Sequence, residues 1–217
     1  MISIIYEDNH LIVINKKSGD LVQADKTNDL TLIDKIKSYI KKKYNKKGNV
    51  FLGVIHRLDR PTSGIVIFAK TSKALKRMNE LFKNKLIKKI YLAIVEKPPP
   101  EISGTLINNL TKNNKKNKSF VTKEGKKSIL FYKMIRKTNN YYLLELTPKT
   151  GRHHQIRTQL SNIGSIIKGD LKYGAKRNNL DGSICLHAYK LEFLHPVKNE
   201  RISLIAETPK SKIWRPN

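Results

Sequence analysis

Apolar and polar positions along the chain follow the patterns expected of β-strands in several places. The first two stretches, residues 2–6 and 10–15, flank a Glu-Asp-Asn segment that favours a turn. The stretch 64–70 is almost entirely apolar, which is typical of a buried strand. Further strand-like stretches occupy residues 51–55, 89–95, 128–136, 141–147, 184–194 and 201–206. These segments predict a chain rich in β-structure.

Apolar residues spaced three or four positions apart predict helices in three places. The first begins at Thr31, which has capping-box spacing with Asp34, and is expected to end near Gly48 after a run of lysines. Its apolar face comprises Leu32, Ile33, Ile36 and Ile40. The second begins near Ser72, and the third covers about residues 154–163. The apolar stripe of the second helix comprises Ala74, Leu75, Met78, Leu81 and Phe82.

The order of these elements predicts the fold class. Strands and helices are interspersed, and several strands have hairpin-like neighbours, which favours an α+β fold. We expect a mixed, largely antiparallel central sheet flanked by helices and loops. A chain of 217 residues fits a single domain, so residues 1–217 are expected to form one.

Charge adds a class of partner to the predicted fold. Lysine and arginine total 44 against 17 acidic residues, a net charge of +27. Such a chain attracts polyanions, and nucleic acid is the commonest of these inside cells. An AT-rich genome also enriches lysine, asparagine and isoleucine, and this bias explains part of the excess.

The remaining composition limits the class of protein. No stretch of about 18 apolar residues is present to span a bilayer, and residues 1–8 lack the pattern of a signal peptide. The only cysteine, Cys185, excludes an internal disulfide. A reducing compartment, and hence a cytoplasmic location, is expected.

Residues 111–127 are polar and rich in lysine and asparagine. We expect most of this segment to be a solvated loop or an irregular hairpin. It would either touch an RNA backbone or be a flexible surface loop, and the sequence leaves both possibilities open.

The segment HRLDRPTSG, residues 56–64, joins two apolar strands and carries the first candidate chemistry. Asp59 lies between Arg57 and Arg60, and nearby cations keep a carboxylate anionic. An anionic carboxylate held in this way can act as a nucleophile or a base. An aspartate in an arginine-rich turn is also a common structural ion pair, so this segment alone does not establish catalysis.

Two further segments carry candidate residues. In GRHHQIR, residues 151–157, Arg157 follows His153 and His154 by one helical turn, and its guanidinium can clamp a carboxylate or a phosphate. Adjacent histidines do not share a helix face, which argues against a metal site there. In KKIYLA, residues 88–93, Tyr91 follows two lysines and can stack on a nucleobase or simply pack in the core.

Together these segments resemble the RluA-type RNA pseudouridine synthase family. HRLDRPTSG resembles the family's HRLDxxTSG signature, GRHHQIR its GRxHQIR motif, and KKIYLAIV its tyrosine motif. The family's C-terminal landmarks resemble Gly169-Asp170, Tyr173-Gly174, Leu186-His187-Ala188 and His195-Pro196. The resemblance covers nearly the whole chain. It implies the pseudouridine synthase fold with a central RNA-binding cleft.

The resemblance also implies an activity and roles for single residues. The chain would be an isomerase that converts uridine to pseudouridine in ribosomal or transfer RNA. Asp59 would be the essential carboxylate, Tyr91 would stack on the target base, and Arg157 would pair with Asp59. Substrate contacts are expected from His56, Arg57, Arg60, Arg152, His154 and Gln155. No metal and no organic cofactor is expected, nor an obligate protein partner or membrane association, and a monomer is the default.

Three departures from the family pattern bear on its subgroup. Gln159 stands where the family often has histidine, and residues 165–168 lack the family's frequent His-Pro. The chain also begins directly with the catalytic region, so we expect no S4 RNA-binding domain.

Two other functions compete with the synthase. One is a non-catalytic RNA-binding protein on the same fold. The other is a metal-dependent hydrolase built on His153, His154 and His187.

Overall fold

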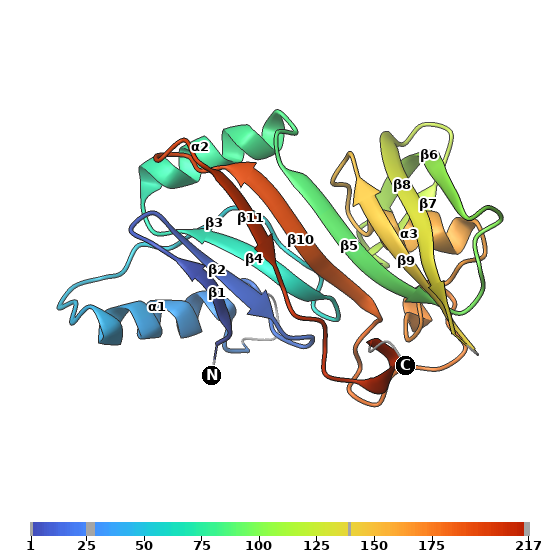
Figure 1. Ribbon diagram of the computed structural model, residues 1–217, viewed down its shortest axis with the longest axis horizontal. Helices are drawn as coiled ribbons and strands as arrows, with labels where there is room; N and C mark the ends of the chain where they lie inside the picture. The colour runs from blue at the N-terminus through green and yellow to red at the C-terminus, as the bar shows by residue number, and fades with distance from the viewer. Residues whose placement is uncertain (1, 25–28, 139, 215–217) are drawn as a thin grey trace. The chain divides into compact units, whose positions relative to one another are not determined.

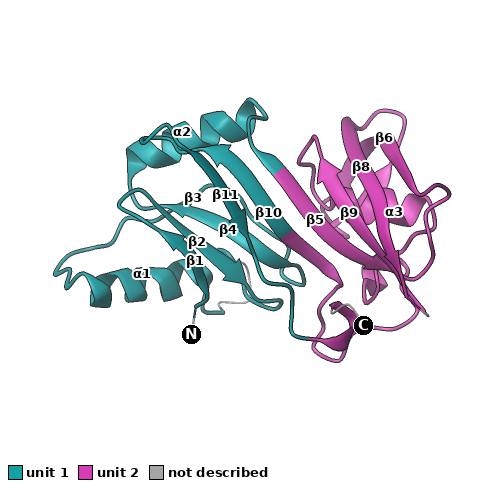
Figure 2. Cartoon of the chain, viewed as in Figure 1, with its two compact units in different colours: residues 1–88, 189–210 teal, residues 89–188, 211–217 magenta. Residues whose placement is uncertain are grey.

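The computed structural model describes residues 2–24, 29–138 and 140–214. The chain divides into two compact units (Figure 2). Unit 1 comprises residues 1–88 and 189–210, and unit 2 comprises residues 89–188 and 211–217. Two strands, β5 and β10, have residues in both units.

Unit 1 is a largely antiparallel sheet with a helix on each face. Its strands are β1 (Ile4–Glu7), β2 (Leu11–Lys16), β3 (Gly53–Val54), β4 (Ser63–Ala69), most of β10 (Leu186–Leu194) and β11 (Arg201–Ile205). β2 pairs with β1 and β4, β3 pairs with β4, and β11 pairs with β10, all antiparallel (Figure 1). The predicted first hairpin is confirmed, and the Asp8 carboxylate closes its turn by accepting from the backbone N–H groups of His10 and Leu11.

Alternation of side chains along β2 and β4 divides the core of unit 1 into two clusters. Ile12, Ile14, Val66 and Phe68 form one cluster with helix α1 (Leu32–Lys43). Leu11, Val13, Ile65 and Ile67 form the other with helix α2 (Ser72–Lys83). Both helices begin as predicted, and the capping box between Thr31 and Asp34 is present. α1 ends at Lys43, earlier than expected.

The predicted strand 51–55 is reduced to β3, two residues long. A Cβ at Gly53 would lie 2.7 Å from a methyl carbon of Leu75 in α2. Gly53 therefore lets β3 pass close beneath this helix.

Besides the start of β10, the described part of unit 2 contains five strands in the order β5-β9-β8-β6-β7, each antiparallel to its neighbours in this order. They are β5 (Lys88–Val95), β6 (Ser103–Asn113), β7 (Lys118–Val121), β8 (Lys126–Lys137) and β9 (Tyr142–Pro148). Helix α3 (Gln155–Asn162) and the short 3-10 helix η1 (Leu171–Tyr173) follow them. A second 3-10 helix, η2 (Lys212–Trp214), lies near the C-terminus.

Of the two possibilities expected for residues 111–127, the hairpin is confirmed and the solvated loop is wrong. The segment is the end of β6, all of β7 and the start of β8, joined by tight turns. The strand 103–110 was also missed. Only a few residues of these strands are buried, among them Leu110 and Ser119, so they lack a continuous apolar face that the sequence would reveal. Hydrogen bonds between the backbones of neighbouring strands hold these residues in β-structure instead.

The α+β class with a largely antiparallel sheet is confirmed. In the described part of the chain, no helix combines the length and the apolar character needed to cross a bilayer.

Candidate active site

The turn that carries Asp59 leads from β3 into β4 in unit 1. The backbone N–H of Thr62 donates to the carbonyl of Asp59 at 3.0 Å and closes the turn. Asp59 itself is half-buried, whereas Arg57 and Arg60 on either side are exposed. The turn therefore presents its charged residues at the surface of unit 1 while Thr62 and Ser63 are buried behind them.

A buried lysine that the sequence reasoning missed supports this turn from beneath. Lys16, at the end of β2, is 1% exposed. Its Nζ donates to the carbonyls of Lys17, Arg60 and Thr62 at 3.0, 3.0 and 2.7 Å, which engages all three ammonium protons. Burial lowers the pKa of Lys16 to about 8, against the opposing effect of the carboxylates of Asp20 and Asp59. Lys16 thus remains mostly cationic at neutral pH and places a buried positive charge beneath the turn that carries Asp59.

Segment 16–20 and the Asp59 turn are joined by several hydrogen bonds. The N–H of Gly19 donates to the carbonyl of Arg60, and the hydroxyl of Ser18 donates to the carbonyl of Pro61. The guanidinium of Arg60 donates to the carbonyl of Gly19 and pairs with Asp29 at 2.9 Å. These contacts fix the backbone around Asp59, and the expected substrate contact of Arg60 stays a prediction.

His56, at the start of the turn, is held by structural contacts. Its Nε2 accepts from the N–H of Ile67 at 3.2 Å, and its ring stacks on Phe82 of α2 with centroids 5.0 Å apart. The imidazole thereby anchors the turn to β4 and α2. Its expected contact with substrate, like that of Arg57, is not tested by these interactions.

Arg157 in unit 2 is the centre of a buried polar network. Only 5% exposed, it makes a bidentate pair with Asp170, which is 1% exposed, at 2.7 and 2.8 Å. Its Nη1 donates to Nε2 of His154 at 3.1 Å. Nδ1 of His154 then lies 3.0 Å from the hydroxyl of Tyr173, and the Tyr173 ring faces the guanidinium. Because Nε2 accepts from a guanidinium, His154 is the neutral tautomer with its proton on Nδ1.

Asp170 as the partner of Arg157 was not anticipated, although Gly169-Asp170 was noted as a landmark. The pairing of Arg157 with Asp59, which lies in unit 1, stays a prediction.

The buried network around Arg157 also bears on the hydrolase alternative, because a guanidinium on Nε2 of His154 disfavours a metal cation at that nitrogen. In the described chain, no three His, Cys, Asp or Glu side chains gather to form a metal site.

The remaining residues of the second motif anchor the start of α3. Gln155 is buried, accepts from the Thr150 hydroxyl and the N–H of Arg152, and donates to the carbonyl of Ile129. Arg152 is exposed, with its Nε donating to the carbonyl of Lys127 at 3.4 Å. Gln155 therefore positions the motif against β8, and the substrate contacts expected of both residues stay predictions.

Gln159, the departure from the family pattern, also has a structural position. It is fully buried, and its Nε2 donates to the carbonyl of Leu106 and to Oδ1 of Asn108, both in β6. It thus fastens α3 to β6 inside unit 2.

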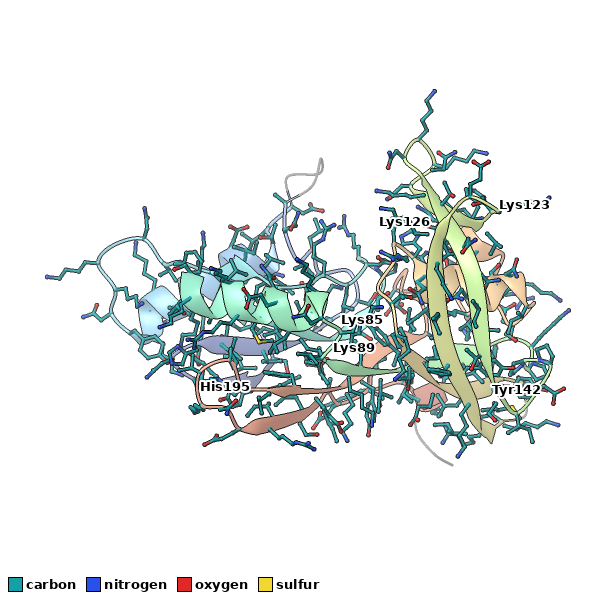
Figure 3. The ribbon with its side chains drawn as sticks, turned by 90° about the horizontal axis from the view of Figure 1, so that it is seen from above. Lys85, Lys89, Lys123, Lys126, Tyr142 and His195 are labelled. Atoms are coloured by element: carbon teal, nitrogen blue, oxygen red, sulfur yellow. The ribbon has the colours of Figure 1, made fainter. Side chains whose placement is uncertain are left out.

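Tyr91 lies on β5 opposite Leu146 of β9 and is half-buried. Lys89, two residues earlier and labelled in Figure 3, faces the same side of the strand. Its Nζ lies 3.8 Å from where a Gly151 Cβ would stand, so it runs beside the start of GRHHQIR. Burial lowers the pKa of Lys89. Lys89 is a second basic residue that the sequence reasoning did not single out.

Comparison with known proteins identifies the family. The family model described as RNA pseudouridylate synthase matches residues 10–162. The chain belongs to this family. It is 35% identical over 213 residues to ribosomal large subunit pseudouridine synthase C of Buchnera aphidicola subsp. Baizongia pistaciae, covering 94% of this chain. It is 36% identical over 220 residues to ribosomal large subunit pseudouridine synthase D of Borreliella burgdorferi, covering 96%. The chain spans 66% of the length of each of these relatives.

The fold of this synthase-family chain also has a solved counterpart. The structure of human RNA pseudouridylate synthase domain containing 4 matches it with a TM-score of 0.79 and 24% identity, covering 96% of this chain and 89% of the human chain. The resemblance inferred from the motifs and the fold inferred from the pattern are both confirmed.

Proposed function

We propose that this chain is an RNA pseudouridine synthase whose reaction depends on the carboxylate of Asp59. Membership of the family supports the reaction type. The observation that carries the role of Asp59 is its place in a turn whose backbone is fixed from beneath by the buried cation of Lys16. A held anionic carboxylate near a fixed cation suits nucleophilic or general-base chemistry.

The target uridine must leave its stack before it can react, at a cost of a few kcal/mol. The C1′–N1 bond then breaks, the detached uracil turns, and a C1′–C5 bond forms. The C5 proton is lost and N1 gains one, so the isomerisation needs no oxidant or reductant. Asp59 either attacks covalently or removes a sugar proton. In this proposal Tyr91 stacks on the uracil, Arg157 supports Asp59, and residues 1–217 act as one catalytic domain.

The substrate is proposed from the relatives. Both are named for the large ribosomal subunit, which favours its RNA over transfer RNA as the substrate of this chain. Such a substrate also favours action in the cytoplasm, and we expect a monomer without an obligate protein partner. Mapping pseudouridines in total RNA from cells with and without the gene would identify the position. Loss of a transfer RNA site alone would contradict the ribosomal substrate.

The decisive substitution is Asp59→Asn. It removes the charge and the nucleophile but keeps the shape, so pseudouridine formation should fall below detection while RNA affinity changes less than about threefold. Asp181→Asn, the same change in an exposed turn of unit 2, should keep full activity. Activity and affinity would be measured on transcribed large-subunit RNA. Unchanged turnover in Asp59→Asn would remove Asp59 from the mechanism. Absence of turnover in the unaltered chain, with RNA binding intact, would favour the non-catalytic RNA-binding protein.

A further inference from the structure

A shallow groove of about 190 Å³ lies on unit 1, between the second half of α1 and the segment that follows it. It is lined by Lys37, Ser38, Lys41, Gly48, Asn49 and Val50. Val50 is buried and packs in the same cluster as Ile36 and Ile40 of α1, which holds this segment alongside the helix. The groove is therefore part of the folded frame of unit 1.

The polar groups in this groove are suited to an anion. Lys37 and Lys41 contribute ammonium groups, Ser38 a hydroxyl and Asn49 an amide, and no carboxylate lines it. Lys37 and Lys41 are four residues apart, so they lie side by side on the helix at a spacing of about 5–6 Å between their Cβ atoms. A pair of cations at that spacing suits neighbouring phosphates of one nucleic-acid strand.

The lysines of α1 differ in how they are engaged. Lys35 pairs with Asp20 at 2.6 Å, and Lys43 pairs with Glu7 at 2.7 Å. Lys37 and Lys41 make no ion pair within the described parts of the chain. The nearest acidic group on the helix, Asp34, is engaged in the capping box with Thr31, although it still attracts Lys37. The positive charge of the groove is thus left largely available for a ligand.

We infer that this groove binds the phosphate backbone of the RNA substrate. The inference rests on the proposed function for the identity of the polyanion. The C-terminal end of a helix repels anions, so the attraction comes from the two ammonium groups rather than from the backbone of α1. The groove is separate in sequence from the Asp59 turn, but both are fixed to one frame. Leu58 packs against the cluster that α1 covers, and Lys35 ties α1 to segment 16–20.

The test compares two pairs of lysines in the full chain. Lys37→Ala with Lys41→Ala removes the groove cations. Lys73→Ala with Lys76→Ala removes two exposed cations from α2 and serves as the matched control. RNA affinity would be measured against salt concentration with a transcribed large-subunit fragment. The groove pair should weaken binding about tenfold and reduce the salt slope by about 1.5, close to 0.7–0.9 for each phosphate contact. The control pair should change the slope by less than half of that.

A second variant tests whether weaker RNA binding comes from the groove itself or from the net charge of the chain. Asn49→Asp adds one carboxylate inside the groove and should weaken binding several-fold, with KM raised and kcat unchanged. The NMR signals of the Ser38 and Asn49 backbone amides should shift when RNA is added. In a separate titration with inorganic phosphate, the same signals should shift only at millimolar concentrations. Equal effects of the two lysine pairs, or unmoved signals with RNA, would overturn the groove. Saturation by phosphate at micromolar concentration would also overturn it, in favour of a small-anion site. RNA affinity, its salt slope and the amide signals are all measured without turnover. A failed groove therefore leaves the Asp59 result intact, and a failed Asp59 result leaves the groove intact.

Discussion

At the scale of single residues, the buried Arg157–Asp170 pair is expected to stabilise the fold and, under the proposed function, to be needed for activity. Both side chains are almost fully buried, and removing one partner of such a pair strands the other charge. Arg157→Ala should therefore lower the free energy of unfolding by about 3–5 kcal/mol and abolish activity. Urea unfolding and pseudouridine formation would measure the two effects.

A paired replacement separates these two roles. Arg157→Met with Asp170→Leu removes both charges, so it should recover most of the stability that Arg157→Ala forfeits while activity stays absent. Full activity in this stable double variant would show that Arg157 serves the fold alone.

The sequence points to candidate residues more readily than to the partners that hold them. Asp59, Tyr91 and Arg157 stand in short motifs that can be read along the chain. Asp170 and Lys16 acquire their roles from neighbours that are 13 and 44–46 residues away. The only sign of Lys16 in the sequence is that a lysine ends an apolar strand. Which carbonyls it caps depends on how β2 pairs with β4, which the sequence does not specify.

At the scale of elements, Glu7 links β1 to α1 and to the end of β4. It pairs with Lys43 and Lys70 and accepts from the hydroxyls of Tyr39 and Tyr44. Burial alone would raise the pKa of Glu7, but these hydrogen bonds outweigh it and lower the pKa to about 2. The stabilisation is therefore present above about pH 4.5 and is lost as the pH falls towards 2.

This linkage predicts an acid-sensitive contact between β1 and α1. The unaltered chain should lose roughly 2 kcal/mol more stability between pH 6 and pH 3 than Glu7→Gln, which has no charge to lose. Urea unfolding at the two pH values would measure this difference. Glu80→Gln, an exposed change on α2, is the control and should follow the unaltered chain. Parallel pH profiles for Glu7→Gln and the unaltered chain would contradict the assignment.

Elements were predictable where they are apolar on at least one face. α1, α2 and β4 bury regular apolar faces, and each was located to within a few residues except at the end of α1. β6 and β7 were missed because polar residues and glycine occupy most of their positions. β6 pairs with β8, and β7 pairs with β6. The hydroxyl of the buried Ser119 in β7 donates to the carbonyl of His153 just before α3. Such long-range pairing leaves no periodic signal in the sequence.

At the scale of the whole molecule, a net charge of +27 must act through particular surfaces if RNA is the substrate. The hairpin over 111–127 exposes one set of lysines in unit 2, including Lys123 and Lys126 (Figure 3). Lys118 is engaged differently, because its ammonium lies over the rings of Phe120 and Tyr173. The groove proposed on α1 presents another set in unit 1. Phosphate contacts that are far apart and share no partner contribute additively to binding free energy.

Replacing Lys115, Lys116, Lys123 and Lys126 with alanine should therefore weaken RNA binding and reduce the salt slope by about 0.7–0.9 for each phosphate that is no longer neutralised. The Lys37→Ala and Lys41→Ala changes should add to this loss within about 0.5 kcal/mol, because the two sets lie on different elements. Titrations of the hairpin, groove and combined variants over a range of salt concentrations would test the sum. An unchanged salt slope in the hairpin variant would mean that the lysines of this hairpin do not contact RNA phosphates. A combined loss well below the sum would mean that the lysines act through net charge alone.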